Sequence, residues 1–230
     1  MSDTLLTMGD LEAFATHRSI TLIRAKHLAK ELKLEKEFEY FNNYNKAAGL
    51  YYHNRYHSCW MMSKVDRLAE AYVTSLESKT ALVLAAMFHD FNHSGGIVSD
   101  EINIDNALKG LNVACYDAFT KHEIRDHAMR LIRVTEFPFV HKPETIEEKI
   151  IRDADILQGC TDHYQKTIYI DLYMELLVKN PGMTLIEYRK GQQKFLEGAE
   201  MFTEIGDLEK QEFLNSHAKY FWREFDKWAT

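Results

Sequence analysis

Two histidines stand four residues apart in residues 52–60, which read YHNRYHSCW. Leu68 and Tyr72 follow at helical spacing, and the same stripe runs back to His57 and His53. We therefore expect both imidazoles to face the interior of the protein. Imidazole is the commonest side-chain ligand of transition metals and also exchanges protons near neutral pH. The stretch could therefore hold a metal ion, donate a proton, or do both.

A second stretch, FHDFNHSGG, covers residues 88–96 and follows a strongly apolar segment. Its adjacent His89 and Asp90 would be costly to bury unless their polar atoms find partners. The simplest common partner for an imidazole and a carboxylate is a divalent cation. His93 repeats the four-residue spacing from His89, so we expect it to face the same cavity.

The third stretch is IIRDADILQG, in which Asp155 lies between apolar neighbours. His57, His89, Asp90 and Asp155 could together form a set of two histidines and two carboxylates with open positions for water. The expected cofactor is one or two divalent metal ions, with zinc, manganese, iron or magnesium as candidates.

Single histidines elsewhere need a different interpretation, because a lone histidine on an apolar face is more often a satisfied core residue than a ligand. We place four histidines in that class: His17, His27, His163 and His217. What favours a metal site is the ordered combination of H-x-x-x-H, HD-x-x-H and D-A-D, each of which ends on a face expected to be buried.

The elements that must position these residues are predicted to be helices. Apolar residues recur at helical spacing almost throughout, and no stretch alternates as a strand would. Residues 80–93 are apolar on all sides and predict a central buried helix, and residues 143–159 predict a helix that carries Asp155. We predict an all-α fold of eight to ten helices in one domain over residues 1–230, with a motif core at about residues 50–160 and helical extensions at either end.

Composition excludes several classes of function. A net charge of −7 and no basic cluster argue against a stable nucleic-acid partner. The longest apolar run, residues 81–88, is too short to span a membrane, and the start MSDTLLTMGD does not read as a signal peptide. Three widely spaced cysteines indicate reduced thiols. We therefore expect a cytoplasmic protein without a membrane partner, and its oligomeric state stays open.

The ordered motifs resemble the HD superfamily of metal-dependent phosphohydrolases, and their details are most similar to its cyclic-nucleotide phosphodiesterase branch. That branch carries the signatures YHNxxH and HDxxHxG, then a threonine-acid pair with a following histidine, then a late aspartate. The matching residues here are Tyr52-His53-Asn54 with His57, His89-Asp90 with His93 and Gly95, Thr135-Glu136 with His141, and Asp155. The resemblance covers about residues 50–160.

Carried over residue by residue, the resemblance implies that His57, His89, Asp90 and Asp155 bind the metal. Asp90 would bridge to a second ion, His53 would be the general acid for the leaving oxygen, and His93 would line the water shell of that second metal. The implied activity is hydrolysis of a phosphoester by a metal-activated water, on a small phosphorylated substrate such as a nucleotide or cyclic nucleotide.

Some alternatives remain open at this point. Asp153 rivals Asp155, although the family pattern favours the aspartate after the alanine and leaves Asp153 to pair with Arg152 or with a histidine. In this interpretation His141 supports the ligand residues from behind or is an occasional ligand of the second metal, whereas His122 is expected at the surface.

Two other functions compete with hydrolysis. A di-iron oxygenase would use the same fold with a site richer in histidine, and a nucleotide sensor would use the pocket without catalysis. Because every residue needed for hydrolysis is present, the phosphohydrolase is the leading prediction.

Overall fold

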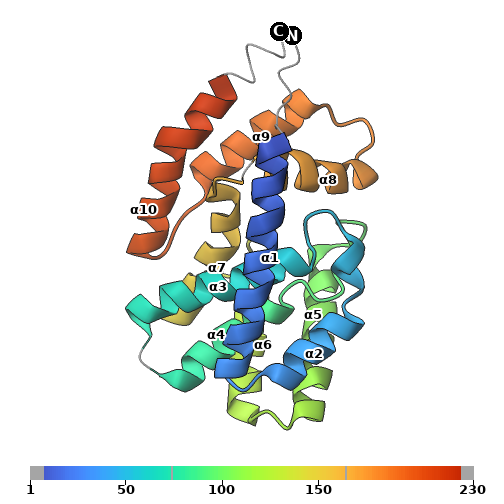
Figure 1. The fold of residues 1–230 in the computed structure, drawn as a ribbon, viewed down its shortest axis with the longest axis vertical. Coiled ribbons are helices and arrows are strands. Elements are labelled where there is room, and N and C mark those ends of the chain that lie inside the picture. Colours follow the sequence, from blue (N-terminus) through green and yellow to red (C-terminus); the bar gives the residue numbers. More distant parts are fainter. Residues whose placement is uncertain (1–7, 74, 164, 224–230) are drawn as a thin grey trace.

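The computed structural model describes residues 8–73, 75–163 and 165–223, and within them every regular element is a helix (Figure 1). The α-helices are α1 (Met8–Glu31), α2 (Glu35–Tyr44), α3 (Arg55–Tyr72), α4 (Leu76–Phe88), α5 (Asp100–Ala118), α6 (His122–Arg133), α7 (Ile146–Leu157), α8 (Tyr173–Lys179), α9 (Leu185–Gly198) and α10 (Glu204–Phe213). Short 3-10 turns and two π-helical segments, Gln165–Leu172 and Leu214–Ala218, join or extend them. The predicted all-α fold of eight to ten helices is confirmed.

Helix α4 is at the centre of the fold, as its sequence predicts. Every residue from Thr80 to Phe88 is buried. The helix packs against both α3 and α6, and α3 also packs against α1 and α7. Since α4 is apolar on all sides, its burial between neighbours is the arrangement that removes most apolar surface from water.

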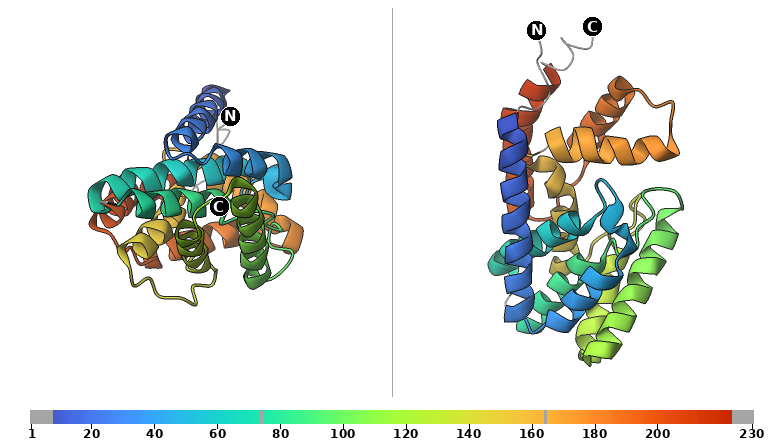
Figure 2. Two further views of the ribbon diagram at one scale, coloured as in Figure 1. Left: turned by 90° about the horizontal axis from the view of Figure 1, so that it is seen from below. Right: turned by 45° about the vertical axis from the view of Figure 1, so that its right-hand side comes forward.

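The remaining helices are arranged around this centre. In the right-hand view of Figure 2, α1 runs along one edge, the orange helices α8 and α9 occupy one end, and α2, α5 and α6 lie toward the other. Helix α7 contributes to two hydrophobic clusters: Ile150 and Leu157 belong to the larger one around α3 and α4, whereas Ile156 belongs to a second one formed with the C-terminal helices. The prediction that residues 1–230 form one domain stays a prediction.

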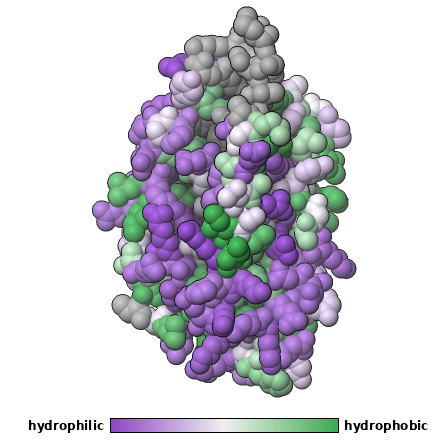
Figure 3. Space-filling model, viewed as in Figure 1, coloured by the Kyte–Doolittle hydropathy of each residue, from purple (hydrophilic) through white to green (hydrophobic). Residues whose placement is uncertain are grey.

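The surface is mostly hydrophilic, and the cysteines are unpaired, as the sequence predicts. Hydrophilic side chains cover most of the face seen in Figure 3, with apolar groups between them. All three cysteines are free thiols. No helix among the described residues has the length and apolar character that crossing a membrane requires. Two of the four histidines expected in the core, His27 and His217, instead have mostly exposed side chains, because each lies on the outer side of its helix.

Candidate metal centre

His57 is fixed in the first turn of α3 by the residue that begins the helix. Asn54 is the N-cap, and its side chain accepts hydrogen bonds from the backbone N–H groups of Tyr56 (2.8 Å) and His57 (3.4 Å). Such a cap satisfies amides that the helix itself leaves unpaired. His53 precedes the cap and lies outside the helix, so the expected helical stripe through both histidines is wrong for His53.

His89, Asp90 and His93 lie at the C-terminal end of α4. The backbone N–H of His89 still bonds to the Ala85 carbonyl at 2.8 Å, and the chain then leaves the helix in a turn. The all-apolar helix therefore delivers an imidazole and a carboxylate to the protein interior. Asp155 reaches the same place from the last turn of α7.

The structure brings the ligand atoms of His57, His89 and Asp90 within 4.8 Å of one another and places Asp155 next to the two histidines. Nε2 of His57 lies 3.0 Å from Nε2 of His89, 3.3 Å from Oδ2 of Asp90 and 3.3 Å from Oδ1 of Asp155. Nε2 of His89 lies 3.1 Å from Asp90 and 3.8 Å from Asp155. Ligands around a metal with bonds of about 2.1 Å are separated by about 3.0–3.4 Å, so most of these separations match the edges of a coordination polyhedron.

Hydrogen bonds on the far side of each imidazole orient its lone pair toward this point. Nδ1–H of His57 donates to Oε1 of Gln158 (2.5 Å), and Nδ1–H of His89 donates to the Ala86 carbonyl (2.9 Å). With a metal bound, each ring would be neutral and would present an unprotonated Nε2, as metal-binding histidines do. Two imidazole nitrogens and carboxylate oxygens thus lie close together, a set of donor atoms that a bound cation would neutralise.

The electrostatics of the cluster lead to the same conclusion. Oδ2 of Asp90 is buried and has no hydrogen-bond partner among the described residues. Burial raises the pKa of Asp90, but His89, His53 and His93 outweigh it and hold the pKa well below its usual range. Burial lowers the pKa of His89, but Asp90 and Asp155 outweigh it and raise the pKa to about 9. The cluster therefore attracts a cation, and the residues present fit a divalent metal ion.

A second cluster lies beside the first and contains His53 and His93. Their rings are 4.0 Å apart between centroids, and the His53 ring is 6.0 Å from that of His57. Nδ1 of His53 bonds to Oε1 of Glu175, a buried residue of α8. The other oxygen of Glu175 accepts from the backbone N–H groups of Tyr52 (2.9 Å) and His53 (3.2 Å). Glu175 thus fixes both the backbone and the ring of His53.

His93 is held from the other side by Asp100, in the first turn of α5. Its Nε2 lies 3.7 Å from Oδ1 of Asp100, and its Nδ1 accepts a hydrogen bond from the N–H of Gly95 at 3.1 Å. The positive φ of Gly95 (+70°) is a conformation that glycine adopts readily. Burial lowers the pKa of His93, but Asp100 and the carboxylates of Asp90 and Glu175 outweigh it and raise the pKa. His93 thus belongs to the second cluster rather than to the four-residue set.

Three residues of the site were missed by sequence reasoning: Gln158, Glu175 and Asp100. Glu175 lies more than a hundred residues after His53 and follows no motif. Gln158 could have been predicted from the sequence, since it stands one helical turn after Asp155 and thus on the same side of the helix. Asp100 belongs to an acidic helix start, which by itself indicates only a favourable helix dipole.

Asp153 is separate from the metal centre. It accepts hydrogen bonds from the backbone N–H groups of Phe202 (2.9 Å) and Thr203 (2.8 Å) and from the Thr203 hydroxyl (2.7 Å). It therefore anchors the start of α10 to α7. Its hydrogen-bond partners are Phe202 and Thr203 rather than a histidine, and Arg152 acts on it only electrostatically. Arg152 instead donates to the carbonyl groups of Val134 and His141.

The histidine of the threonine-acid segment also lies away from the four-residue set. The His141 side chain is exposed, and its Nε2 is 3.8 Å from a carboxylate oxygen of Glu136. Thr135 is buried and donates to the Ile132 carbonyl. No described contact joins these residues to the metal cluster. His122 is exposed, as expected.

Comparisons of this chain with protein-family models, with curated proteins and with solved structures give no match. The assignment of a function therefore depends on the motifs and on the geometry described above.

Proposed function

We propose that this chain is a metal-dependent phosphohydrolase of the HD type, which hydrolyses a phosphomonoester or phosphodiester bond of a nucleotide or cyclic nucleotide. The observation that carries the proposal is that the ligand atoms of His57, His89 and Asp90 lie within 4.8 Å of one another, with Oδ1 of Asp155 3.3 Å from Nε2 of His57. Two imidazoles and two carboxylates suit zinc, manganese or iron, and the carboxylates also suit magnesium.

A divalent ion held by these residues would lower the pKa of a bound water to near neutrality and screen the charge of a phosphoryl group. The chain itself supplies the orientation of the ligands. Gln158 and the Ala86 carbonyl keep the protons of His57 and His89 on Nδ1, so that Nε2 is free to bind.

His53 is the proposed general acid. Its Nδ1 is bonded to the buried carboxylate of Glu175, which fixes the orientation of the ring. The Nε2 proton of that ring can then be donated to the leaving oxygen of the substrate. Glu175 positions His53 without touching the substrate, in the manner of a carboxylate that orients a catalytic histidine.

A di-iron oxygenase is the second candidate, and a specific observation favours it. The donor atoms of His53, His93 and Glu175 lie within 4.8 Å of one another, so they form a second potential metal-binding group beside the first. If that group binds iron, His53 is a ligand rather than an acid. Iron occupancy with an optical spectrum that responds to oxygen would identify this function.

A product assay tests the proposal. The purified protein, loaded in turn with manganese, zinc, iron and magnesium, is incubated with nucleoside mono- and triphosphates, cyclic mononucleotides and cyclic dinucleotides. We expect release of phosphate or opening of a cyclic ester that is lost in Asp90→Ala and retained in His122→Ala, an exposed histidine that serves as the matched control.

His53→Ala separates the two candidates. Loss of turnover with full metal content supports a general acid, whereas loss of metal makes His53 a ligand. Absence of any product from the metal-loaded protein across the panel would contradict nucleotide hydrolysis.

A further inference from the structure

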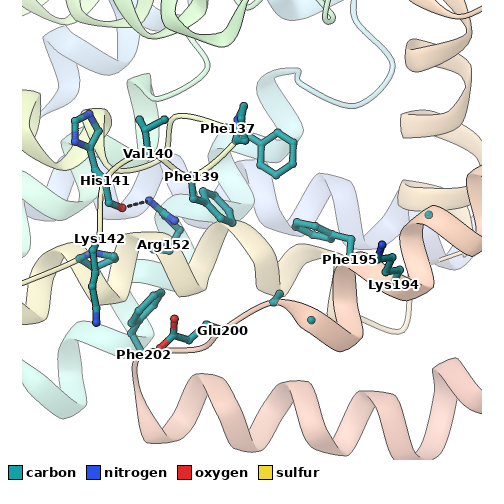
Figure 4. A pocket seen from close by; sticks show the side chains of 15 residues that line it. Phe137, Phe139, Val140, His141, Lys142, Arg152, Lys194, Phe195, Glu200 and Phe202 are labelled. Carbon is teal, nitrogen blue, oxygen red and sulfur yellow. Dashed lines mark hydrogen bonds between the residues drawn. The ribbon is translucent and has the colours of Figure 1, made fainter.

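A cavity of about 780 Å³ lies next to α7, away from the four-residue metal cluster. Figure 4 shows that three parts of the chain surround it. These are the loop with Phe137 to Lys142, helix α7 with Arg152, and the end of α9 with the residues that follow it, from Lys194 to Phe202. Its volume falls in the range of pockets that hold small molecules.

Aromatic side chains line one part of this cavity. Phe137 and Phe139 are 54% and 38% exposed, an unusual exposure for two phenylalanines so close in sequence. Their rings are 5.3 Å apart between centroids, and the ring of Phe137 lies 5.9 Å from that of Phe195 on α9. A planar aromatic group packed on these rings would remove apolar surface from water.

Positive charges line the other part. Lys142, Lys194 and Arg152 line the cavity, and Glu200 is the one carboxylate among its lining residues. This excess of positive charge occurs in a chain whose net charge is −7. Neither lysine has an ion pair or a hydrogen bond within the part of the chain that the structure describes. The cavity is therefore complementary to an anion.

Arg152 is buried in the wall of this cavity and is not a surface charge, because only 2% of the residue is exposed to solvent. Its Nε and one terminal nitrogen donate to the Val134 and His141 carbonyl groups, and its guanidinium lies 3.7 Å from the centroid of the Phe139 ring. No carboxylate lies within ion-pair distance of it among residues 8–73, 75–163 and 165–223. Asp153 and Asp155 act on it only from beyond ion-pair distance, so the cavity offers an oriented guanidinium without a directly bound anion.

We propose that this cavity is a binding site for a small aromatic molecule that carries a phosphate group. The aromatic part packs on Phe137, Phe139 and Phe195, and the phosphate lies among Lys142, Lys194 and Arg152. This binding site depends on the proposed phosphohydrolase function only for the choice of a nucleotide as probe, since binding in the cavity needs neither the metal nor hydrolysis.

One contact and one helix connect the cavity to the candidate metal centre. The backbone N–H of Phe137 donates to Oδ2 of Asp100 at 2.6 Å, and the other oxygen of Asp100 faces His93. Arg152 stands one helical turn before Asp155 on α7. A ligand in the cavity would thus contact segments that also support the candidate catalytic residues.

Binding of AMP to the metal-free chain, measured by calorimetry in the presence of a chelator, tests the proposal. Adenosine and inorganic phosphate are measured separately, because each carries one half of the recognised chemistry. Lys194→Ala removes one cation and Phe137→Ala removes one aromatic wall; both side chains are exposed, so the fold should tolerate either change. Lys190→Ala, on the same helix but outside the cavity lining, is the matched control.

We expect AMP to bind more tightly than adenosine or phosphate, and each of the two cavity variants to weaken AMP binding by about tenfold or more. Lys190→Ala should leave the affinity unchanged. The proposal is overturned if AMP does not bind the metal-free chain, or if it binds equally well to the wild type and to both cavity variants. Either result leaves the product assay for hydrolysis unaffected, so the two proposals fail separately.

Discussion

Replacing Glu175 with glutamine should destabilise the protein at neutral pH. The change keeps the shape of this buried side chain and removes its negative charge, which weakens the hydrogen bonds that the side chain accepts. Glu175 accepts three hydrogen bonds, two from backbone N–H groups and one from the ring of His53. Hydrogen bonds to a charged group contribute about 1.5–3 kcal/mol each and neutral ones about 0.5–1.5 kcal/mol. Weakening two bonds and losing the third predicts a loss of about 3 kcal/mol in the free energy of unfolding.

The loss should depend on pH in a defined direction. Burial raises the pKa of Glu175, but its hydrogen bonds with His53 and the adjacent backbone outweigh it and lower the pKa. A carboxyl group with a lowered pKa in the folded state stabilises the protein above its unfolded pKa of about 4.3, and this contribution is lost as the pH falls through the folded value. The difference between wild type and Glu175→Gln should therefore be full at pH 7 and shrink in acid.

Urea unfolding at a series of pH values, in the presence of a chelator, measures this difference directly. Glu39→Gln, an exposed residue, is the control for removing one negative charge. A change of less than about 0.5 kcal/mol at neutral pH, the usual range for surface substitutions, would refute the reasoning. So would a loss of stability in Glu175→Gln that stays constant as the pH falls below the unfolded pKa.

Three further predictions concern the surroundings of the metal centre. Asp155→Asn should reduce metal affinity with little loss of stability, whereas Asp153→Asn should destabilise the protein by about 2 kcal/mol and still bind metal; calorimetry and urea unfolding distinguish the two. Gln158→Leu should lower metal affinity about 10- to 100-fold, because the histidine it orients loses its acceptor; unchanged affinity would contradict this. Asp100→Asn should lower the pKa of His93, which NMR titration of the metal-free protein measures. Since the pKa of His93 is raised, its stabilising contribution is present below about pH 6.5 and lost as the pH rises through the folded value. The variant should show less of that dependence, because Asp90 and Glu175 still act on His93.

Local patterns were sufficient to predict the helices and the residues that meet at the metal centre. The apolar run of α4 predicts its burial, and its end must then bring His89 and Asp90 inside. His57 and Asp155 follow from helical spacing in the same way. The start of α3 was harder to predict. The helix begins directly after its cap, Asn54, so His53 lies outside the helix although it fits the helical spacing.

The remaining features depend on contacts between distant segments, which a single sequence does not encode in its spacing. Glu175 joins α8 to the segment before α3 through hydrogen bonds across more than a hundred residues. Asp153 resembled a ligand in the D-A-D segment, yet its carboxylate bonds to the start of α10. The cavity beside Arg152 is formed by the loop that carries His141, by α7 and by α9, which only the fold brings together.

Anomalous X-ray scattering from crystals grown with manganese or zinc tests the central claim most directly. We expect an anomalous peak about 2.0–2.2 Å from Nε2 of His57, from Nε2 of His89 and from carboxylate oxygens of Asp90 and Asp155. The peak should disappear in Asp90→Ala, with the fold unchanged. A peak elsewhere, or no peak between these four side chains at saturating metal, would contradict the account.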